Sequence, residues 1–586
     1  MLSTALFCVT LLSAFEHASA ADVLNVNAWQ TEKGKYPSLE DFPESAYDDI
    51  MSRPNTAIAF SGGGSRSYAA TMGYLAGLNE LGLMENVRYI SGISGGSWAT
   101  SVYSYAQTDV PDDVMLGPIV APSDIVYDQL HEMDPLCVRA YTNSCIGEIA
   151  IMAIKNDVPG VDKLADGWAY GVQTEYLDPV GITAGAHWSW NEASVADIKR
   201  RNPSLKDEKF LLPAKPTRPF MVLGSAAVGP ADHAPYPTKA HNFTMIELTP
   251  LYVGNAYSMD VDYQDGNKLV HTEHIHKPET LTIGGYVETF GFGRSGDAKG
   301  SAPLVGLKDD ETAGTLRVPA PVKPLDIQYA ASASGYAPAA FFESSHVPGI
   351  AETFGLHFSY WSPSERVAPK ASDMLYTDGG CLSDVMLMSF LQRRVSNIVL
   401  FLNKHTPMLP ASDWNVDVDE PSGDQIDDGF QAYFGIVPPA PNKIVERSFQ
   451  IEKNQVFATE DFYPVVHAMQ AAQAEGRGVV HSVNLTTVEN AWWGIPAGFT
   501  AEITFVYLSR LSTWEAELSE EMQSMVVPDK GDPADMSNTI SHGVFKGYPH
   551  YFTAGGLQTH QQTNLLADMS GWVIQQNKEL FKRILS

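Results

Sequence analysis

The chain has 586 residues, with 38 Lys and Arg against 69 Asp and Glu, a formal net charge of −31 and a pI near 4.8. Nucleic acids and anionic membranes attract basic surfaces, so this balance argues against nucleic-acid binding and against electrostatic docking on a membrane. Hydrophobic residues make up 44% of the chain, which excludes a disordered acidic tail and indicates a sizeable core.

Residues 1–20 predict a cleaved signal peptide. A short apolar run contains Leu6, Phe7, Val9, Leu11 and Leu12, and Ala18-Ser19-Ala20 forms an A-x-A cleavage site. No later stretch has about 18 apolar residues in a row, so we expect no transmembrane segment. The predicted location is secreted, or a lysosomal or vacuolar lumen. Residues 21–50 are expected to form an extended leader.

The cysteines and sequons fit an oxidising compartment. Cys8 leaves with the signal peptide, and Cys137 and Cys145, eight residues apart, are predicted to form a disulfide. Cys381 is then left over as a buried thiol. Two N-x-S/T sequons predict glycosylation in a eukaryotic host, at Asn242 and Asn484.

Apolar strands and amphipathic helices alternate from about residue 55, which predicts an α/β fold with a mostly parallel sheet. Buried strands are predicted at 57–60, 87–93, 220–227, 245–248, 398–402 and 501–507, and helices after the first two strands and at 385–391 and 564–585. Residues 51–586 form one predicted domain, with insertions at about 107–216 and 255–345. Acidic residues 409–429 are predicted to be a solvated loop, because their spacing does not fit a calcium loop.

Gly92-Ile93-Ser94-Gly95-Gly96 lies between the second predicted strand and its helix. A G-x-S-x-G turn in this place holds a serine in a strained elbow and exposes its hydroxyl. The helix that follows adds its dipole and N-terminal amides near a developing anion. The pattern therefore predicts a nucleophile, and a structural glycine–serine turn is the alternative.

Ser61-Gly62-Gly63-Gly64-Ser65-Arg66 follows the first predicted strand. Consecutive glycines let several backbone N–H groups point at one anion, which suits an oxyanion hole or a phosphate cradle. The segment lacks the Gly-Lys-Ser/Thr and G-x-G-x-x-G patterns of nucleotide sites. Arg66, on the first helical turn, could pair with a phosphate. Asp378-Gly379-Gly380 is a common turn that does not by itself require a catalytic role.

Together, S-G-G-G-x-R, G-x-S-G-G about thirty residues later and a distant D-G-G resemble the patatin-like superfamily. The sequence is similar in particular to the catalytic domain of cytosolic phospholipase A2 and phospholipase B, the lysophospholipases. Residues 92–98 resemble that branch's G-L-S-G-S-T-W, although Gly96 replaces its Ser. Residues 247–250 resemble its E-F-T-P strand end, and 488–496 a lysophospholipase segment. The resemblance covers most of 51–585 in motif order and implies a three-layer α/β/α fold with cap insertions.

The resemblance also implies an enzyme, a phospholipase A2/B or lysophospholipase that cleaves fatty-acyl esters at a lipid interface. Ser94 would be the acyl nucleophile and Asp378 its base, acting without histidine. Amides of Gly63, Gly64 and Gly95 would form the oxyanion hole. Arg66 would hold the phospholipid phosphate. No metal or cofactor is expected. About 40 residues separate the predicted cleavage point from the motifs, too few for a C2 domain, so we expect a calcium-independent enzyme acting on micellar, lysosomal or extracellular lipid.

Four alternatives stay open. A Ser-His-Asp triad would use Ser94 with His542, His550 or His560. A catalytically silent lipid-binding protein could have the same fold. The H-x-x-H-x-H segment at 271–276 is either a polar loop or a metal site. Four tryptophans belong either to a lipid-facing rim or to ordinary packing, namely Trp188, Trp190, Trp492 and Trp493.

Overall fold

The structure is a computed structural model that describes residues 23–130, 137, 146–159, 164–234, 242–263, 279–294, 302–303, 305–308, 310–339, 354–365, 369–438, 450–526, 544–551 and 558–586. The predicted signal peptide, Cys145, His542 and the 271–276 segment lie outside these residues. What was predicted for them therefore stays a prediction.

Parallel strands form the centre of a sheet that has thirteen strands within the described residues. In spatial order the parallel strands are β6 (Phe220–Pro230), β3 (Tyr89–Gly92), β2 (Thr56–Phe60), β13 (Asn397–Leu402) and β15 (Thr500–Tyr507). Every residue of β2, β3 and β6 is buried, as expected for strands that are covered on both faces. The predicted α/β fold with a parallel central sheet is confirmed.

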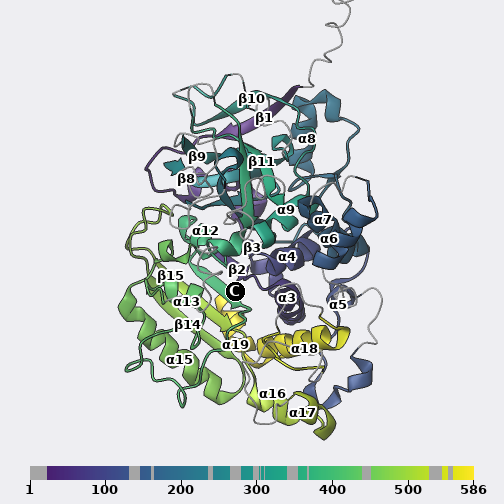
Figure 1. Cartoon of the computed structure of the whole chain (residues 1–586), viewed down its shortest axis with the longest axis vertical. Coiled ribbons are helices and arrows are strands. Elements are labelled where there is room, and N and C mark those ends of the chain that lie inside the picture. Colours follow the sequence, from purple (N-terminus) through teal and green to yellow (C-terminus); the bar gives the residue numbers. More distant parts are fainter. Residues whose placement is uncertain are drawn as a thin grey trace, which may run out of the picture.

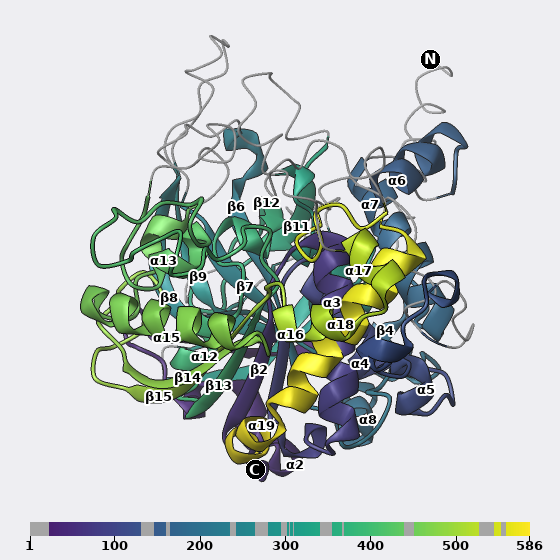
Figure 2. The ribbon, with the colours of Figure 1, turned by 90° about the horizontal axis from the view of Figure 1, so that it is seen from below.

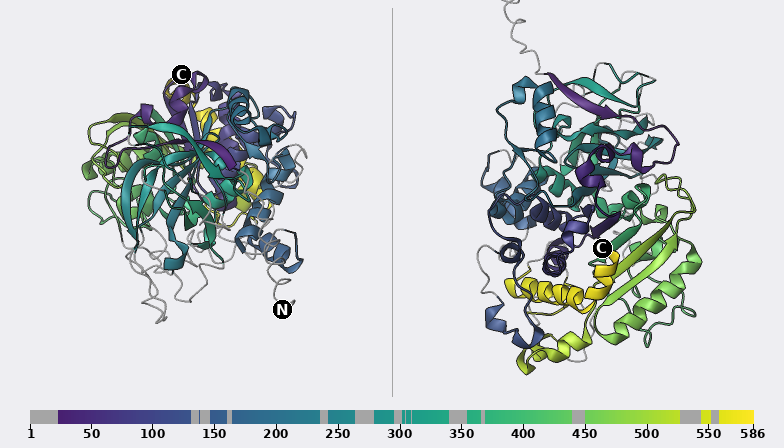
Figure 3. Two further views of the ribbon diagram at one scale, coloured as in Figure 1. Left: turned by 90° about the horizontal axis from the view of Figure 1, so that it is seen from above. Right: turned by 180° about the vertical axis from the view of Figure 1, so that it is seen from behind.

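Antiparallel strands extend the sheet at both ends. β14 (Val479–Thr486) pairs with β15 at one end. Beyond β6 the order continues through β7 (Thr244–Leu248), β8 (Tyr252–Tyr263), β9 (Glu279–Glu288), β1 (Val23–Trp29) and β10 (Ala313–Pro319). β1 and β10 lie near one end of the long axis of the molecule, and β14 and β15 lie toward the other (Figure 3). A separate pair, β11 (Leu356–Tyr360) and β12 (Ser372–Asp378), joins the sheet because β12 pairs with β6.

Two segments expected outside the sheet thus supply strands to it. Residues 23–29, expected in a leader, form β1, in which Leu24, Val26 and Ala28 are buried and alternate with more exposed positions. That alternation is typical of a strand with one face on a core. The stretch at 255–345, expected to be an insertion, contributes most of β8 and all of β9 and β10.

Helices cover both faces of the central strands (Figure 2). α3 (Gly64–Glu80), α4 (Gly95–Tyr105) and α18 (His560–Gln576) lie on one face, and α12 (Leu387–Gln392) and α15 (Phe462–Glu475) on the other. α3 packs closely on α18 because Gly73 has no side chain: a Cβ there would lie 2.7 Å from the carbonyl carbon of Ala567. The helix predicted at 564–585 is two helices, α18 and α19 (Lys578–Ile584).

Further helices surround this framework (Figure 1): α5 (Asp112–Leu116), α6 (Ile146–Lys155), α7 (Leu164–Val172), α8 (Glu192–Arg201), α9 (Ile327–Ser334), α13 (Asp428–Ala432), α16 (Ser512–Glu517) and α17 (Glu520–Val526). Three short elements are α2 (Asp48–Met51), β4 (His187–Trp188) and β5 (Phe210–Leu211). One large hydrophobic core lies between the central sheet and the helices that cover it. A smaller core lies between β1, β10 and α8. Among the described helices, none combines the length and apolarity that crossing a membrane requires.

The four tryptophans take part in packing. Trp188, Trp190 and Trp493 are buried. Trp492 is half-buried, donates from Nε1 to the carbonyl of Phe243 at 3.1 Å, and lies under the Lys453 ammonium, 3.4 Å from the ring centroid. These contacts favour the packing alternative over the lipid-facing rim.

Candidate active site

The candidate site lies where β2, β3 and β13 end. β2 is followed in sequence by β3 on one side of it, while β13 lies on its other side, so the strand order reverses at β2. In open α/β sheets, crevices for ligands form at the carboxyl ends of strands at such a switch point. The glycine loop follows β2, the Ser94 turn follows β3 and the segment beginning at Asn403 follows β13.

Ser94 lies in a strained turn between β3 and α4. It has φ 52° and ψ −126°, a backbone conformation that residues other than glycine rarely adopt, and it directly precedes the first turn of α4. Its N–H donates to the carbonyl and hydroxyl oxygens of Ser334 at the end of α9, at 3.1 and 3.2 Å. The Ser94 side chain is therefore held at the N-terminus of a helix, as the predicted elbow requires.

The glycines around Ser94 allow the two turns to touch. A Cβ on Gly95 would overlap the carbonyl of Gly64, and a Cβ on Gly96 would lie 2.7 Å from the carbonyl oxygens of Phe60 and Ser61. Only glycine permits the Ser94 turn to pack this closely on the loop after β2. The need for glycine at these positions of the Ser94 motif thus has a direct steric cause.

Asp378 is the last residue of β12, beside Ser225 of β6. Its Oδ1 accepts a hydrogen bond from the Gly380 N–H at 2.8 Å. Burial raises the pKa of Asp378 to about 7, the Gly380 hydrogen bond and the nearby Ser94 side chain oppose the rise, and the charge of Asp384 adds to it. Ser94 and Asp378, 284 positions apart in the sequence (378 − 94), are brought together.

The predicted oxyanion-hole residues line the same corner. Gly64 and Gly95 are the first residues of α3 and α4, positions whose N–H groups have no partner within their helix. Gly63 precedes α3 with φ 131°, and Gly64 has φ 56°. The Gly62 N–H is already engaged, because it donates to both the backbone and the side-chain oxygen of Asp384 at 3.0 Å.

Arg66 is buried on the first turn of α3. Its Nε donates to the Asn403 carbonyl at 3.0 Å and its Nη1 to the Tyr551 carbonyl at 2.5 Å. Its Nη2 lies against Gly63, where a Cβ would approach it to 2.5 Å. Burial lowers the pKa of Arg66 to about 10. The guanidinium therefore ties the first turn of α3 to the segments at Asn403 and Tyr551, and keeps one nitrogen beside Gly63.

The described histidines of the triad alternative have other surroundings. His550 is buried, its Nδ1 pairs with the Lys404 carbonyl at 2.9 Å, and burial lowers its pKa to about 3. His560 begins α18.

Asp232, His233 and Glu279 have potential ligand atoms within 4.8 Å of one another, but His233 also pairs with Asp232 at 2.8 Å.

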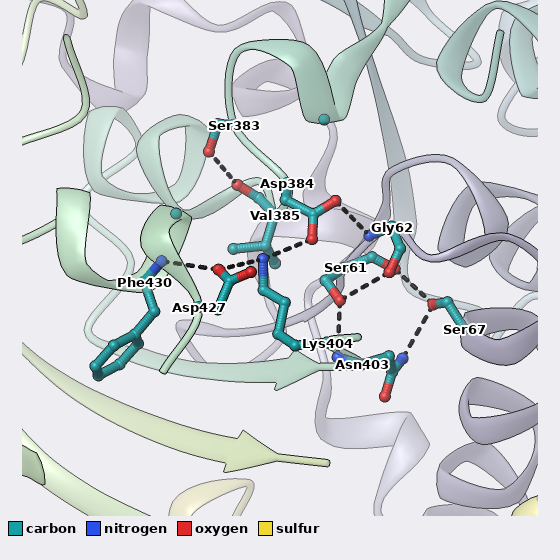
Figure 4. Close-up of polar contacts among 12 residues, drawn as sticks. Ser61, Gly62, Ser67, Ser383, Asp384, Val385, Asn403, Lys404, Asp427 and Phe430 are labelled. Carbon is teal, nitrogen blue, oxygen red and sulfur yellow. Dashed lines mark hydrogen bonds and ion pairs between the residues drawn. The ribbon is translucent and has the colours of Figure 1, made fainter. Parts of the chain in front are cut away.

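Sequence reasoning missed a charged cluster beside the glycine loop. Lys404 is buried and contacts Asp384 Oδ2 at 2.6 Å and Asp427 Oδ1 at 2.9 Å (Figure 4). Asp427, near the end of the acidic 409–429 loop, also accepts from the Phe430 N–H at 3.0 Å and so caps the N-terminus of α13. The available signal was a lysine placed two residues after an apolar strand.

The two other motifs of the resemblance, at 247–250 and 488–496, make contacts that stabilise the fold. Glu247 makes two hydrogen bonds with the buried Arg393, at 2.7 and 2.6 Å, and Glu44 contacts the same guanidinium at 2.8 Å. In the 488–496 segment, the Asn490 amide donates to two backbone carbonyls. These residues fix the fold around the site.

Asn242 is half-buried and bonds to the carbonyl of Asp262, whereas Asn484 is exposed on β14. Cys137 and Cys381 are buried, and the predicted partner of Cys137 lies outside the described residues. Glycosylation and the disulfide therefore stay predictions.

Comparison with known proteins identifies the region of the site. Residues 58–173 match the patatin-like phospholipase family model. Cytosolic phospholipase A2 zeta of Mus musculus is 42% identical over 73 residues, which cover 12% of this chain and 8% of that protein. The Homo sapiens protein of that name is 50% identical over 48 residues, covering 8% and 6%. Putative meiotic phospholipase SPO1 of Saccharomyces cerevisiae is 40% identical over 73 residues, covering 11% and 12%.

Among solved structures, human GIVD cytosolic phospholipase A2 is similar with a TM-score of 0.45 and 12% identity, covering 92% of this chain and 62% of that one. The sequence matches thus span only a small part of the relatives they match.

The predicted location needs a correction. The expectation of a secreted protein, or one in a lysosomal or vacuolar lumen, is wrong, because the matched relatives are named as cytosolic phospholipases A2. That expectation depended on the short apolar run at 6–12. Residues 1–20 contain no Lys or Arg before this run, and the acidic Glu16 follows it. Runs of that length occur equally in ordinary core helices, so they do not by themselves specify export.

Proposed function

From the premise that the chain carries a patatin-like phospholipase domain of the cytosolic phospholipase A2 type, we propose that it hydrolyses fatty-acyl esters of phospholipids or lysophospholipids with a Ser94–Asp378 dyad. The observation that carries the proposal is that Ser94, in its strained turn, lies close enough to interact with a carboxyl group whose pKa burial raises to about 7. A base with a pKa near neutrality can both accept and return a proton at the working pH.

In the proposed reaction, the Ser94 hydroxyl attacks the ester carbonyl carbon while its proton passes to the Asp378 carboxylate. The tetrahedral intermediate collapses, the bond to the alcohol breaks, and Asp378 gives the proton to the leaving oxygen. Water then attacks the acyl-enzyme and passes a proton to Asp378. The bond from the acyl carbon to Ser94 Oγ breaks, and Asp378 returns the proton to the serine.

The oxyanion of each tetrahedral intermediate would be held by N–H groups of the two helix N-termini. Gly64 and Gly95 supply such groups, and Gly63 lies next to them. Losing one donor of this kind typically lowers the rate by about 100- to 1000-fold. Arg66 would contribute its positive charge to a phosphate bound beside Gly63.

Mass spectrometry of products from mixed phospholipid and lysophospholipid micelles tests the proposal, together with labelling by a fluorophosphonate probe. Ser94→Ala should abolish labelling, and both Ser94→Ala and Asp378→Asn should abolish fatty-acid release. Matched controls are Ser123→Ala and Asp124→Asn, at exposed positions in the 122–124 turn, which should behave as wild type.

Full hydrolysis by either site variant would refute the dyad. Wild-type protein that binds micelles, takes up no probe and releases no fatty acid would instead be a silent lipid-binding protein. The ratio of products from the two substrates distinguishes a phospholipase from a lysophospholipase.

A further inference from the structure

The cluster of Asp384, Lys404 and Asp427 lies beside the glycine loop at Ser61 and Gly62 (Figure 4). The Lys404 side chain is 5% exposed and makes ion pairs with both carboxylates. One ammonium between two carboxylates leaves the cluster one negative charge when all three groups are ionised. A buried lysine with two such partners is fixed in place, because losing either contact leaves a charge poorly solvated.

The cluster reaches the glycine loop through Asp384. Its Oδ1 accepts from the Gly62 N–H at 3.0 Å, while its Oδ2 accepts from Lys404. Gly62 lies between this carboxylate and the nucleophile: a Cβ there would overlap Asp384 Oδ1 and lie 3.2 Å from Ser94 Cβ. On its other side the loop is held by Asn403, whose N–H donates to Ser61 Oγ at 2.8 Å.

The cluster also faces the proposed base. A Cβ on Gly380 would lie 3.0 Å from Asp384 Oδ1 and 3.1 Å from Asp378 Oδ1, so both carboxylates face the same side of Gly380. The negative charge of Asp384 disfavours ionisation of Asp378 and contributes to its raised pKa. Lys404 is shared between Asp384 and Asp427 and so does not neutralise both carboxylates.

Resting on the proposed function, we propose that Asp384 is a positioning residue for acyl transfer. Clamped by Lys404, it holds the Gly62 amide and thereby the loop of the oxyanion hole, and it places a second negative charge beside the base Asp378. The acidic loop takes part in this arrangement through Asp427, which shares Lys404.

Other charged and titratable groups pack against the cluster from several elements, namely Arg66 on α3, His405 after β13, Asp428 on α13, Tyr433 after α13, Tyr507 on β15 and His550. Burial lowers the pKa of His405 to about 4 and that of His550 to about 3, so both are neutral near pH 7. Burial raises the pKa of Asp384 itself and raises that of Asp428 to about 6, so Asp428 is a competing titrating group to control for.

The test is the pH dependence of kcat/KM between pH 5 and 9, measured with a soluble short-chain ester. Asp384→Asn keeps an oxygen for Gly62 but turns an amide nitrogen toward Lys404 and removes a negative charge. The acidic limb of the profile should shift to lower pH by roughly half a unit or more, because the pKa of the base falls. The value of kcat at the plateau should fall by roughly tenfold or more. Asp384→Glu should recover part of the charge effect but not the loop geometry.

Asp424→Asn is the matched control, since it removes one exposed charge of the same acidic loop. Asp428→Asn is measured alongside. An Asp384→Asn limb that stays at the wild-type pH, or that moves no further than the Asp428→Asn limb, would overturn the inference. If Asp384→Asn does not fold, Asp427→Asn takes its place, because it removes charge from the cluster without touching Gly62. In that case an unmoved limb overturns the electrostatic role.

This failure is distinguishable from failure of the proposed function. If Ser94→Ala and Asp378→Asn remain active, the dyad itself is wrong. If both are inactive while Asp384→Asn keeps the wild-type profile and rate, only the role of Asp384 is wrong.

Discussion

Replacing the proposed base should make the protein more stable, in a way that depends on pH. Burial raises the pKa of Asp378 from 3.8 to about 7 in the folded chain. An acid whose folded pKa is raised opposes folding once the pH exceeds its unfolded pKa, because the unfolded chain then releases the proton first. The opposing effect is absent below about pH 3.8, grows as the pH rises, and is complete above about pH 7. Asp378→Asn cannot ionise and escapes it.

The size follows from the two pKa values. Each pH unit between them lowers the free energy of unfolding by about 1.4 kcal/mol, which gives roughly 4 kcal/mol in full. At pH 5 the effect is roughly 1.6 kcal/mol and at pH 8 it is complete, so the advantage of Asp378→Asn should grow by roughly 2–3 kcal/mol between these two values. Any constant offset in stability from altered contacts with Gly380 or Ser94 cancels in that difference.

Thermal unfolding of both proteins at one scan rate, at pH 5, 6, 7 and 8, measures this change. For a chain of this length, about 1 kcal/mol corresponds to roughly 1 °C, so the Tm difference should widen by roughly 2 °C. Asp124→Asn should show no such trend. A Tm difference that stays constant or narrows between pH 5 and 8 would refute the reasoning that burial has raised the pKa of Asp378.

Three further predictions concern the framework. Arg393→Met should lower the free energy of unfolding by about 3–5 kcal/mol, because it leaves Glu247 and a second buried carboxylate without a counter-charge, and denaturant unfolding measures the loss. Ser94→Gly and Ser94→Ala should both be inactive, yet the glycine variant should have the higher Tm, by an amount equivalent to about 1–2 kcal/mol, since φ 52° strains alanine. Equal Tm values would argue against strain at this turn. Gly95→Ala places a Cβ on the Gly64 carbonyl and should slow fluorophosphonate labelling by about 100-fold or more, whereas labelling at the wild-type rate would contradict the close contact.

Local sequence patterns predicted the central strands because those strands are buried on both faces. The apolar runs at 57–60, 398–402 and 501–507 all lie in parallel strands of the sheet. Most of the antiparallel strands escaped prediction because a strand with one buried face alternates polar and apolar residues, whereas β7, which is buried throughout, is among the predicted strands. β1 shows this in its sequence Val-Leu-Asn-Val-Asn-Ala-Trp. Such a short alternation is also compatible with an extended leader.

The sequence by itself determined the chemistry available to this protein: a serine in a glycine-flanked turn, a run of glycines after a strand, and an aspartate before two glycines. These motifs are local, since each needs only a few neighbouring residues to form its turn. Only the tertiary structure decided that Ser94 and Asp378 lie close together, that Gly62 is held by Asp384, and that Lys404 joins Asp384 to the acidic loop. The physical reason is burial. The pKa of a carboxyl group and the partner of a lysine depend on which distant segments exclude water from them.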